Sequence, residues 1–581
     1  MCGICGVYNA SRNGEEIVQS MLESSAMVAR GPDARYCKKI DDSTVIGMSR
    51  LSIVGLDNGD QPFEYGGACG VVNGEIYNHK ELKNTHIIEC QTESDCEVVL
   101  SMFVDHGPEG LMTLDGMFAA AVVFDDSLFL FRDRYGKKPL YYAKSESAFV
   151  FSSSLETMRQ CEIVDSVFTV PPGHVMKVSN QGKIETQRYY HPEFMRPGYV
   201  PNVHLDKAKV KNLIEAAVCK RLAADVPVGV MLSGGLDSTV VATIAKKYVG
   251  DLHTFSVGFK GDIDMLYARE VAEQLGTNHH ELVLSVEEYA DLFGDAMKSL
   301  QYATFPLLAM VKTTALSRFI RDLGFKVVLV GEGADELFGG YKENESAASE
   351  LDMFHQRRKM IMSLSGTELI RVDRVTMGHS VEARAPFMDN ELIEYVMSIK
   401  GPHFMPQKGL TKMLIRELFE TETNWSVMYR PKTYRSLFKV EQVIKRRLSK
   451  MDTNVGGFAE LLIMGGTSAM ITSYTYAASL AKERGLFDEK YTMDSFCGPR
   501  SIELPWYLLL HRFKMIPFKW RYINCYLRIV TRMWGAIIEQ IQILDKRTFR
   551  EEIAYTLTLS SNDFFSTRIA QMIYGKATNA S

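Results

Sequence analysis

The first residue of this 581-residue chain that could do chemistry is Cys2. It follows Met1, and its small side chain favours removal of that methionine, so we expect the mature chain to begin at Cys2. One residue would then carry both a thiol and a free α-amine. Because an α-amine titrates at about pH 7.7–8.0, it can take the thiol proton near neutral pH and leave a nucleophilic thiolate. The alternative is a small buried apolar cysteine, and the residues downstream decide between the two.

Three polar segments within the first 190 residues offer partners for this thiol. One is a cation followed by residues of mixed polarity: Arg50, Leu51, Ser52, Ile53 and Val54. The other two carry an amide and carboxylates: Asn73, Gly74 and Glu75, and then Asp95. A guanidinium binds a carboxylate with two hydrogen bonds, two carboxylates can hold an ammonium, and amide and backbone N–H groups stabilise an oxyanion. Together with Cys2, these groups are what a site needs to bind glutamine and hydrolyse its side-chain amide.

The residues around these groups resemble the class II glutamine amidotransferases, which have an N-terminal nucleophile. Five strings carry the resemblance: Cys2-Gly3-Ile4-Cys5-Gly6, Arg30-Gly31-Pro32-Asp33, Arg50-Leu51-Ser52-Ile53, Asn73-Gly74-Glu75-Ile76-Tyr77-Asn78 and Arg132-Asp133-Arg134-Tyr135-Gly136. The resemblance implies an oxyanion hole made by Asn73 and the Gly74 N–H. It also implies that glutamine is bound by Arg50, Leu51, Ser52, Ile53, Val54, Asn73, Gly74, Glu75 and Asp95. The implied fold is that of an N-terminal nucleophile (Ntn) hydrolase, a four-layer αββα sandwich.

A different pattern begins after residue 190. Prolines gather at 171–173 and 192–201 and predict a linker over residues 191–206. Apolar residues then recur at helical spacing over 207–222, and an apolar run at 226–232 predicts a buried strand. The run leads into Ser233-Gly234-Gly235-Leu236-Asp237-Ser238 and a predicted helix over 239–248. A strand, a glycine turn and a helix aim backbone N–H groups at an anion, and this is not a Walker A loop because no Gly-Lys-Ser/Thr follows.

This string resembles the pyrophosphate loop of the ATP pyrophosphatases, which make acyl adenylates and release pyrophosphate. The resemblance implies that the phosphates of ATP are held by Ser233, Gly234, Gly235 and Ser238. It implies that Leu232 and Val257 line the adenosine pocket, and that Asp237 ligates Mg²⁺, a cation that prefers oxygen ligands.

A second strand and glycine turn follow at 327–330 and 331–340. Because ligands bind at the carboxyl ends of parallel strands, the two turns predict a doubly wound parallel sheet with its site at one edge. By the same resemblance, Val330 and Gly331 contact ATP, Asp335 is the second Mg²⁺ ligand, and Glu332 acts in forming or consuming the acyl adenylate. The family commonly has Ser or Thr at the position of Val330.

The string at 373–389 and the string Arg430-Pro431-Lys432 look like those of the glutamine-dependent asparagine synthetases. The likeness implies that Lys432 meets the negative charge that develops on the adenylate. It also implies the reaction: Cys2 releases ammonia from glutamine, and the ammonia attacks an aspartyl adenylate to give asparagine, AMP and pyrophosphate. We expect an apolar tunnel between the two sites, because free ammonia would escape or take up a proton in bulk water.

Two alternatives stay open. Asparagine synthetases commonly continue with a Phe-Ser-Asp-Gly-like run where this chain reads Thr433-Tyr434-Arg435-Ser436, so the acceptor could be a larger carboxylate, such as a uronic acid or a biosynthetic intermediate. The chain could also be a binding or regulatory protein whose two sites are catalytically inactive. Retention of Cys2, Asp237, Glu332 and Asp335 argues against that second alternative.

The composition limits the partners and the cellular location that we expect for this protein. A net charge of −5 does not favour nucleic-acid binding, and ten scattered cysteines with a nucleophilic thiol predict a reducing, cytoplasmic location.

We predict a glutaminase domain over 1–190, an ATP-pyrophosphatase domain over 207–440 and a mostly helical extension over 441–581. The basic, tryptophan-bearing stretch at 500–550 could pack on the second domain, form a homodimer contact or, as the less favoured alternative, touch a membrane surface.

Overall fold

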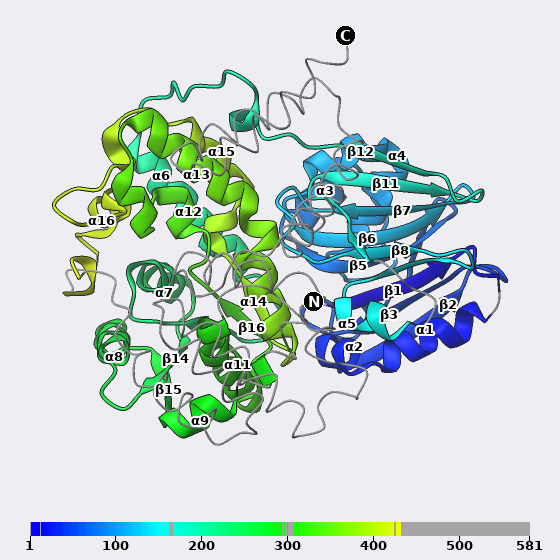
Figure 1. Ribbon diagram of the computed structural model, residues 1–581, viewed down its shortest axis with the longest axis horizontal. Coiled ribbons are helices and arrows are strands. Elements are labelled where there is room, and N and C mark those ends of the chain that lie inside the picture. The colour runs from blue at the N-terminus through cyan, green and yellow to red at the C-terminus, as the bar shows by residue number, and fades with distance from the viewer. Residues whose placement is uncertain are drawn as a thin grey trace, which may run out of the picture. The chain divides into compact units, whose positions relative to one another are not determined.

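The computed structural model describes residues 2–11, 13–161, 167–292, 295–296, 299, 307–422 and 426–430. The chain divides into two compact units, Met1–Phe487 and Asp488–Ser581, and every described residue lies in the first. Within that unit the described residues form two regions, which we call the sandwich (residues 2–188) and the α/β lobe (residues 207–430) (Figure 1). None of the helices that the structure describes has the length and hydrophobicity needed to span a bilayer.

The sandwich is built on two antiparallel six-stranded sheets. The first has the order β10-β8-β9-β1-β3-β2, with β1 Cys2–Tyr8, β2 Ala34–Lys39, β3 Val45–Arg50, β8 Tyr141–Lys144, β9 Phe149–Ser152 and β10 Phe168–Thr169. The second has the order β12-β11-β7-β6-β5-β4, with β4 Phe63–Tyr65, β5 Ala68–Ile76, β6 Gly116–Phe124, β7 Ser127–Arg132, β11 His174–Ser179 and β12 Ile184–Arg188.

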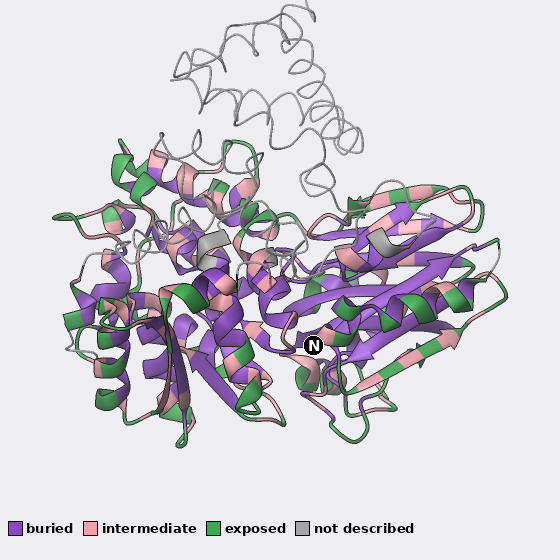
Figure 2. Cartoon of the chain, turned by 60° about the horizontal axis from the view of Figure 1, so that its bottom comes forward, coloured by how far each residue is buried: buried purple, intermediate pink, exposed green. Residues whose placement is uncertain are grey.

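Helices cover the outer face of each sheet. The first sheet is covered by α1 Gly14–Glu23, α2 Ser25–Arg30 and α5 Leu155–Gln160, and the second by α4 Glu97–Thr113, against which α3 His79–Thr85 packs. The central strands therefore have both faces covered, and β1 is buried along its whole length, which explains its unbroken apolar run. Figure 2 shows these strands in purple and the exposed residues on the outward faces of the helices. The four-layer sandwich that the sequence predicted is confirmed.

The α/β lobe is built on a parallel five-stranded sheet. Its order is β15-β14-β13-β16-β17, with β13 Val228–Met231, β14 His253–Phe259, β15 Asn278–Leu284, β16 Val327–Leu329 and β17 Glu382–Arg384. The helices are α6 Lys207–Arg221, α7 Leu236–Tyr248, α8 Ile263–Leu275, α9 Val286–Asp291, α11 Leu307–Asp322, α12 Ala334–Phe338, α13 Glu350–Ser363, α14 Glu368–Met377, α15 Asn390–Ser398 and α16 Met413–Phe419. Short 3₁₀ turns lie in the lobe at η2 Lys342–Ser346, η3 Leu364–Gly366, η4 Pro386–Met388, η5 Pro402–Phe404 and η6 Ser426–Met428, and η1 Glu193–Met195 precedes the lobe.

Helices cover both faces of this sheet, as the sequence predicted. Val240 and Ile244 of α7 share a core with Val230 and Leu329, whereas α11 packs on the opposite face against Val328. In the register of β13 and β16, Val230 lies opposite Leu329. The two glycine turns that follow these strands therefore leave the same edge of the sheet side by side, where ligands bind in doubly wound folds.

Candidate active sites

Cys2 begins β1, which is an interior strand of the first sheet. It lies opposite Arg50 of β3 and is 7% exposed. The Cys2 backbone N–H donates to Oδ1 of Asn73 at 3.2 Å, and Asn73 belongs to β5 in the other sheet. The sandwich thus brings the predicted nucleophile to one of the two predicted oxyanion-hole residues, and Gly74 follows directly on the same strand.

The Cys2 thiol requires a base. Burial raises the pKa of this thiol, and the Leu51 backbone N–H and the Arg50 guanidinium offset only part of the rise. The neutral thiol therefore predominates near neutral pH. A proton acceptor close to the sulfur must act before the thiolate can attack an amide.

The predicted carboxylate-binding cation, Arg50, ends β3 and is buried. Its Nη1 donates to Oδ1 of Asp60 at 2.7 Å and to the Leu56 carbonyl at 3.3 Å, so the loop after β3 surrounds the guanidinium. A ligand carboxylate would share Arg50 with Asp60. Of the residues that follow Arg50, Leu51 and Ile53 are buried and Ser52 and Val54 are half-buried.

The two predicted ammonium-binding carboxylates are both buried. Burial raises the pKa of Glu75 well above its ordinary value, and Asp95 and Glu382 add to the rise, although Arg384 Nη2 lies 3.1 Å from Glu75 Oε2. Burial also raises the pKa of Asp95, whose Oδ2 accepts the Ile76 N–H at 2.6 Å. Two buried carboxylates thus lie near each other, an arrangement that suits a ligand ammonium.

The second candidate site begins where β13 ends. Gly235 caps the 13-residue helix α7, and the hydroxyls of Ser233 and Ser238 lie 3.0 Å apart across the turn. Gly234 has a φ of 69°, and a Cβ there would lie 2.2 Å from the Asp264 carbonyl oxygen, so only glycine fits. The turn therefore places two hydroxyls beside the start of a helix, as a phosphate site requires.

Asp237 of α7 and Asp335 of α12 lie close enough to share one cation. The Nζ of Lys412 is 2.7 Å from Asp237 Oδ2 and 2.6 Å from Asp335 Oδ1. These are the two residues predicted to ligate Mg²⁺, and they meet although 98 residues separate them in the sequence. Lys412 was not predicted, because nothing in its local sequence points to this contact.

A cavity of about 810 Å³ lies at this edge of the sheet. Its lining includes most of the residues predicted to bind ATP, acyl adenylate or metal: Leu232, Ser233, Gly235, Asp237, Ser238, Val257, Val330, Gly331, Glu332 and Asp335. Gly234 is not part of the lining, since it packs against α8 instead. Val330 is 3% exposed and belongs to the same buried apolar cluster as Leu316 and Ile320 of α11, so most of its side chain lies in the core.

Titratable groups gather around Glu332 in this cavity. Burial raises the pKa of Glu332, and Arg371 Nη2 lies 3.4 Å from its Oε1. Burial also raises the pKa of Glu336 to about 7, while Tyr341 donates to it at 2.6 Å. The predicted site residues do not include Glu336, Tyr341 or Arg371, although Glu336 lies in the predicted turn.

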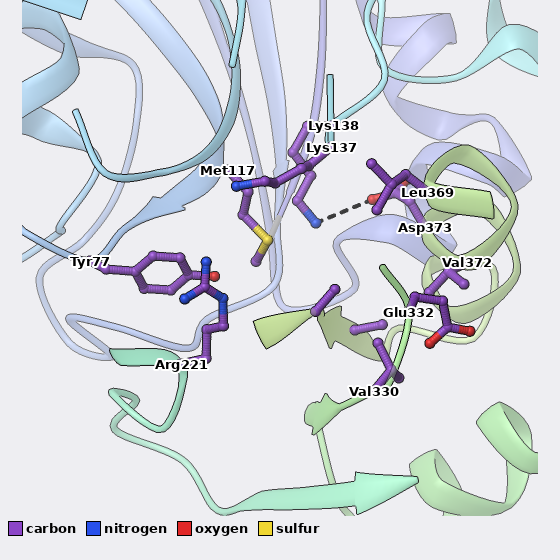
Figure 3. A pocket seen from close by; sticks show the side chains of 12 residues that line it. Tyr77, Met117, Lys137, Lys138, Arg221, Val330, Glu332, Leu369, Val372 and Asp373 are labelled. Atoms are coloured by element: carbon purple, nitrogen blue, oxygen red, sulfur yellow. Dashed lines mark hydrogen bonds and ion pairs between the residues drawn. The ribbon is translucent and has the colours of Figure 1, made fainter. Parts of the chain in front are cut away.

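A second, small cavity is lined by residues of both the sandwich and the α/β lobe (Figure 3). Its volume is about 20 Å³, enough for one water-sized molecule. The sandwich contributes Tyr77, Met117, Lys137 and Lys138, and the lobe contributes Arg221, Val330, Glu332, Leu369, Val372, Asp373, Ala383 and Ala385. Glu332 and Val330 also line the large cavity. Its wall combines apolar side chains with charged ones, and the apolar tunnel between the two sites stays a prediction.

Two predictions lie outside the described residues. One is Lys432 and its contact with an adenylate, and the other is the extension over 441–581.

The comparisons with known proteins agree with this geometry. The asparagine synthase family model matches residues 209–368 and 352–491, and the glutamine amidotransferase domain model matches residues 1–167. The first match extends beyond residue 440, where the motifs recognised in the sequence end.

Three relatives illustrate the similarity. Asparagine synthetase (glutamine-hydrolyzing) 3 of Arabidopsis thaliana is 36% identical over 446 residues, which are 73% of this chain and 76% of the relative. Asparagine synthetase B of Escherichia coli strain K12 is 34% identical over 457 residues, 74% and 81% of the two chains. The probable asparagine synthetase of Schizosaccharomyces pombe is 33% identical over 453 residues, 72% and 80% of the two chains. The chain belongs to the family of glutamine-hydrolysing asparagine synthetases.

Proposed function

We propose that this protein makes asparagine from aspartate, taking the nitrogen from glutamine and consuming ATP. The observation that carries the proposal is the small cavity between the two candidate sites. Its wall contains Tyr77, two residues after the glutamine-site residue Glu75, and Glu332, which also faces the predicted ATP site. A nitrogen released in the sandwich would thus find a water-sized space that borders the site of amide formation.

In the glutaminase half, Cys2 is the nucleophile. Removal of Met1 would turn the nitrogen that now faces Asn73 Oδ1 into an α-amine, which takes the thiol proton. The thiolate attacks the side-chain carbonyl of glutamine, Asn73 and the Gly74 N–H stabilise the oxyanion, and ammonia leaves behind a thioester that water hydrolyses. The buried carboxylates of Glu75 and Asp95 fit the substrate ammonium, and Arg50 fits its carboxylate.

In the synthetase half, the turn of Ser233, Gly235 and Ser238 holds the phosphates of ATP. Asp237 and Asp335 fit a divalent cation, because both carboxylates already converge on the single positive charge of Lys412. Mg²⁺ held there would neutralise the pyrophosphate that leaves when the adenylate forms. Glu332, with its raised pKa and its Arg371 partner, lies where the adenylate is made and consumed.

A test of the acceptor measures pyrophosphate release with glutamine, Mg·ATP and a panel of acids. Release that requires aspartate, with asparagine as the product, supports the proposal. Release only with another acid, such as a uronic acid, identifies a different acceptor and refutes aspartate. Glutamine hydrolysis without pyrophosphate release from any acid would mean that the synthetase half is inactive.

Two variants test the division between the sites. Cys2→Ala should abolish glutamine use and leave ammonia-dependent synthesis intact, because solution ammonia bypasses the thiol. Asp237→Asn should stop synthesis with either nitrogen source and leave glutamine hydrolysis. Both are measured as glutamate and asparagine formed per minute. Loss of ammonia-dependent synthesis in a folded Cys2→Ala protein would show that the sites are not separate.

We also propose that the enzyme works in the cytoplasm, because its nucleophilic thiol must stay reduced. A homodimer is a further prediction, which sedimentation velocity of the purified protein would test.

A further inference from the structure

The string Arg30-Gly31-Pro32-Asp33 has no role in the chemistry described so far. It joins the end of α2 to the start of β2 and lies directly against β3, since a Cβ on Gly31 would be 2.2 Å from the backbone of Ser49. The Asp33 N–H donates to the Arg50 carbonyl at 3.0 Å. The string therefore packs on the strand that carries Arg50 and pairs with Cys2.

Arg30 connects Cys2 to the α/β lobe. Its Nε donates to the Cys2 carbonyl oxygen at 3.3 Å, and its Nη1 and Nη2 donate to the two oxygens of Asp373 at 2.8 and 3.4 Å. Lys138 lies 3.4 Å from the same carboxylate. Burial alone would raise the pKa of Asp373, but Arg30 and Lys138 outweigh it and hold the pKa below its ordinary range.

Asp33 makes a second connection of the same kind. Its Oδ2 accepts the Ser52 N–H at 2.8 Å and pairs with Nζ of Lys326 at 2.7 Å. Lys326 also donates to the Ser52 carbonyl at 3.3 Å. A third lobe residue, Ser380, donates from its hydroxyl to the Ala29 carbonyl at 2.6 Å. Residues of the lobe thus hold the string at two points, Arg30 and Asp33, and the residue before it at a third, and the two points within the string lead to glutamine-site segments.

We propose that the α/β lobe completes the glutaminase site, with Asp373 positioning Cys2 through Arg30 and Lys326 positioning residues 50–54 through Asp33. The inference rests on the proposed glutaminase function. Arg30 is 1% exposed, and a buried guanidinium stays in place only with its counter-ion. Without Asp373, Arg30 loses the partner that holds it over the Cys2 backbone, and the thiol loses its alignment with Asn73.

The test uses the full-length protein and two readouts of the glutaminase site without ATP. One is glutamate formation from glutamine, and the other is the rate at which iodoacetamide alkylates Cys2, followed by mass spectrometry. The variants are Asp373→Asn and Lys326→Met. The exposed Lys359→Met on α13 is a matched control for loss of a lysine.

Asp373→Asn should lower kcat for glutamine hydrolysis by about 10–100-fold, since a misplaced nucleophile costs that much, with little change in KM. Its alkylation rate should fall as well, and ammonia-dependent synthesis should remain. Lys326→Met should act mainly on KM for glutamine, because it moves the binding segment. Lys359→Met should match the wild type in all of these measurements.

If Asp373→Asn does not fold, the double variant Asp373→Asn/Lys138→Met is used in its place. It removes one negative and one positive charge, so the net charge of the ion cluster is unchanged. Wild-type rates of hydrolysis and alkylation in a folded Asp373 variant would overturn the inference, as would an equal fall in ammonia-dependent synthesis. A wild-type protein that does not hydrolyse glutamine would instead refute the proposed function.

Discussion

Replacing Lys412 with methionine removes the cation between Asp237 and Asp335 and leaves an unbranched side chain that is one atom shorter. The two carboxylate oxygens lie 2.7 and 2.6 Å from the same nitrogen, so they are no more than about 5.3 Å apart, the sum of the two distances. At that separation two unit charges repel by about 3 kcal/mol at an effective dielectric constant of about 20. The two side chains are only 18% and 15% exposed, so water screens this repulsion incompletely.

We therefore expect Lys412→Met to lower the free energy of unfolding by up to about 3 kcal/mol and to lower the Tm by a few degrees. Mg²⁺ without ATP should restore most of the loss, because in the variant two carboxylates converge on the space that the Lys412 ammonium occupied. At a Mg²⁺ concentration about 100 times Kd, binding would contribute about 2.7 kcal/mol. In the wild type Lys412 competes for the same oxygens, so Mg²⁺ alone should change Tm little.

The assay is thermal unfolding of both proteins over a Mg²⁺ titration, in the absence of nucleotide. Lys312→Met is the control, because Lys312 lines the same cavity and pairs with a single carboxylate, Asp262, at 3.0 Å. That variant should lose stability without recovery in Mg²⁺. The claim that Asp237 and Asp335 can share one cation would be refuted if Lys412→Met were as stable as the wild type. It would also be refuted if Mg²⁺ stabilised Lys412→Met no more than Lys312→Met.

Two further predictions concern single residues of the sites. Asn73→Ala should lower kcat for glutamine hydrolysis by about 10²–10³-fold, because that is the usual cost of losing one oxyanion donor. Ammonia-dependent synthesis should be unchanged. A variant with the wild-type kcat for glutamine hydrolysis would show that Asn73 is not an oxyanion donor. Glu336 has a folded-state pKa of about 7 against an ordinary value of 4.5, so the stability that its protonated form contributes is fully present below pH 4.5 and is lost as the pH rises through 7. The loss is about 3 kcal/mol, and urea unfolding should detect it in the wild type and not in Glu336→Gln.

Much of the local structure could be predicted from the sequence. The apolar run at 226–232, the glycine turn and the helix correspond to β13 and α7, and the helix over 207–222 corresponds to α6 Lys207–Arg221. These segments were predictable because short-range signals define them: a buried strand is apolar throughout, and a turn with positive φ needs glycine.

Contacts made between distant segments were not predictable in the same way. Lys412 reaches Asp335 across 77 residues, and Asp373 reaches Arg30 across 343. No periodicity marks a lysine or an aspartate as the partner of a residue so far away. The charged lining of the small cavity was missed for a related reason, since Lys137, Lys138 and Arg221 resemble surface residues until the fold buries them.

The place of β1 in its sheet has a consequence for biosynthesis. Cys5 of β1 pairs with Gly47 of β3 on one side and with Ser152 of β9 on the other, so the strand that bears the nucleophile has both neighbours only after about 150 residues have left the ribosome. A pairing between segments so far apart in the chain forms late. The site around the thiol of the nascent protein is therefore assembled only when the sheet closes on both sides of β1.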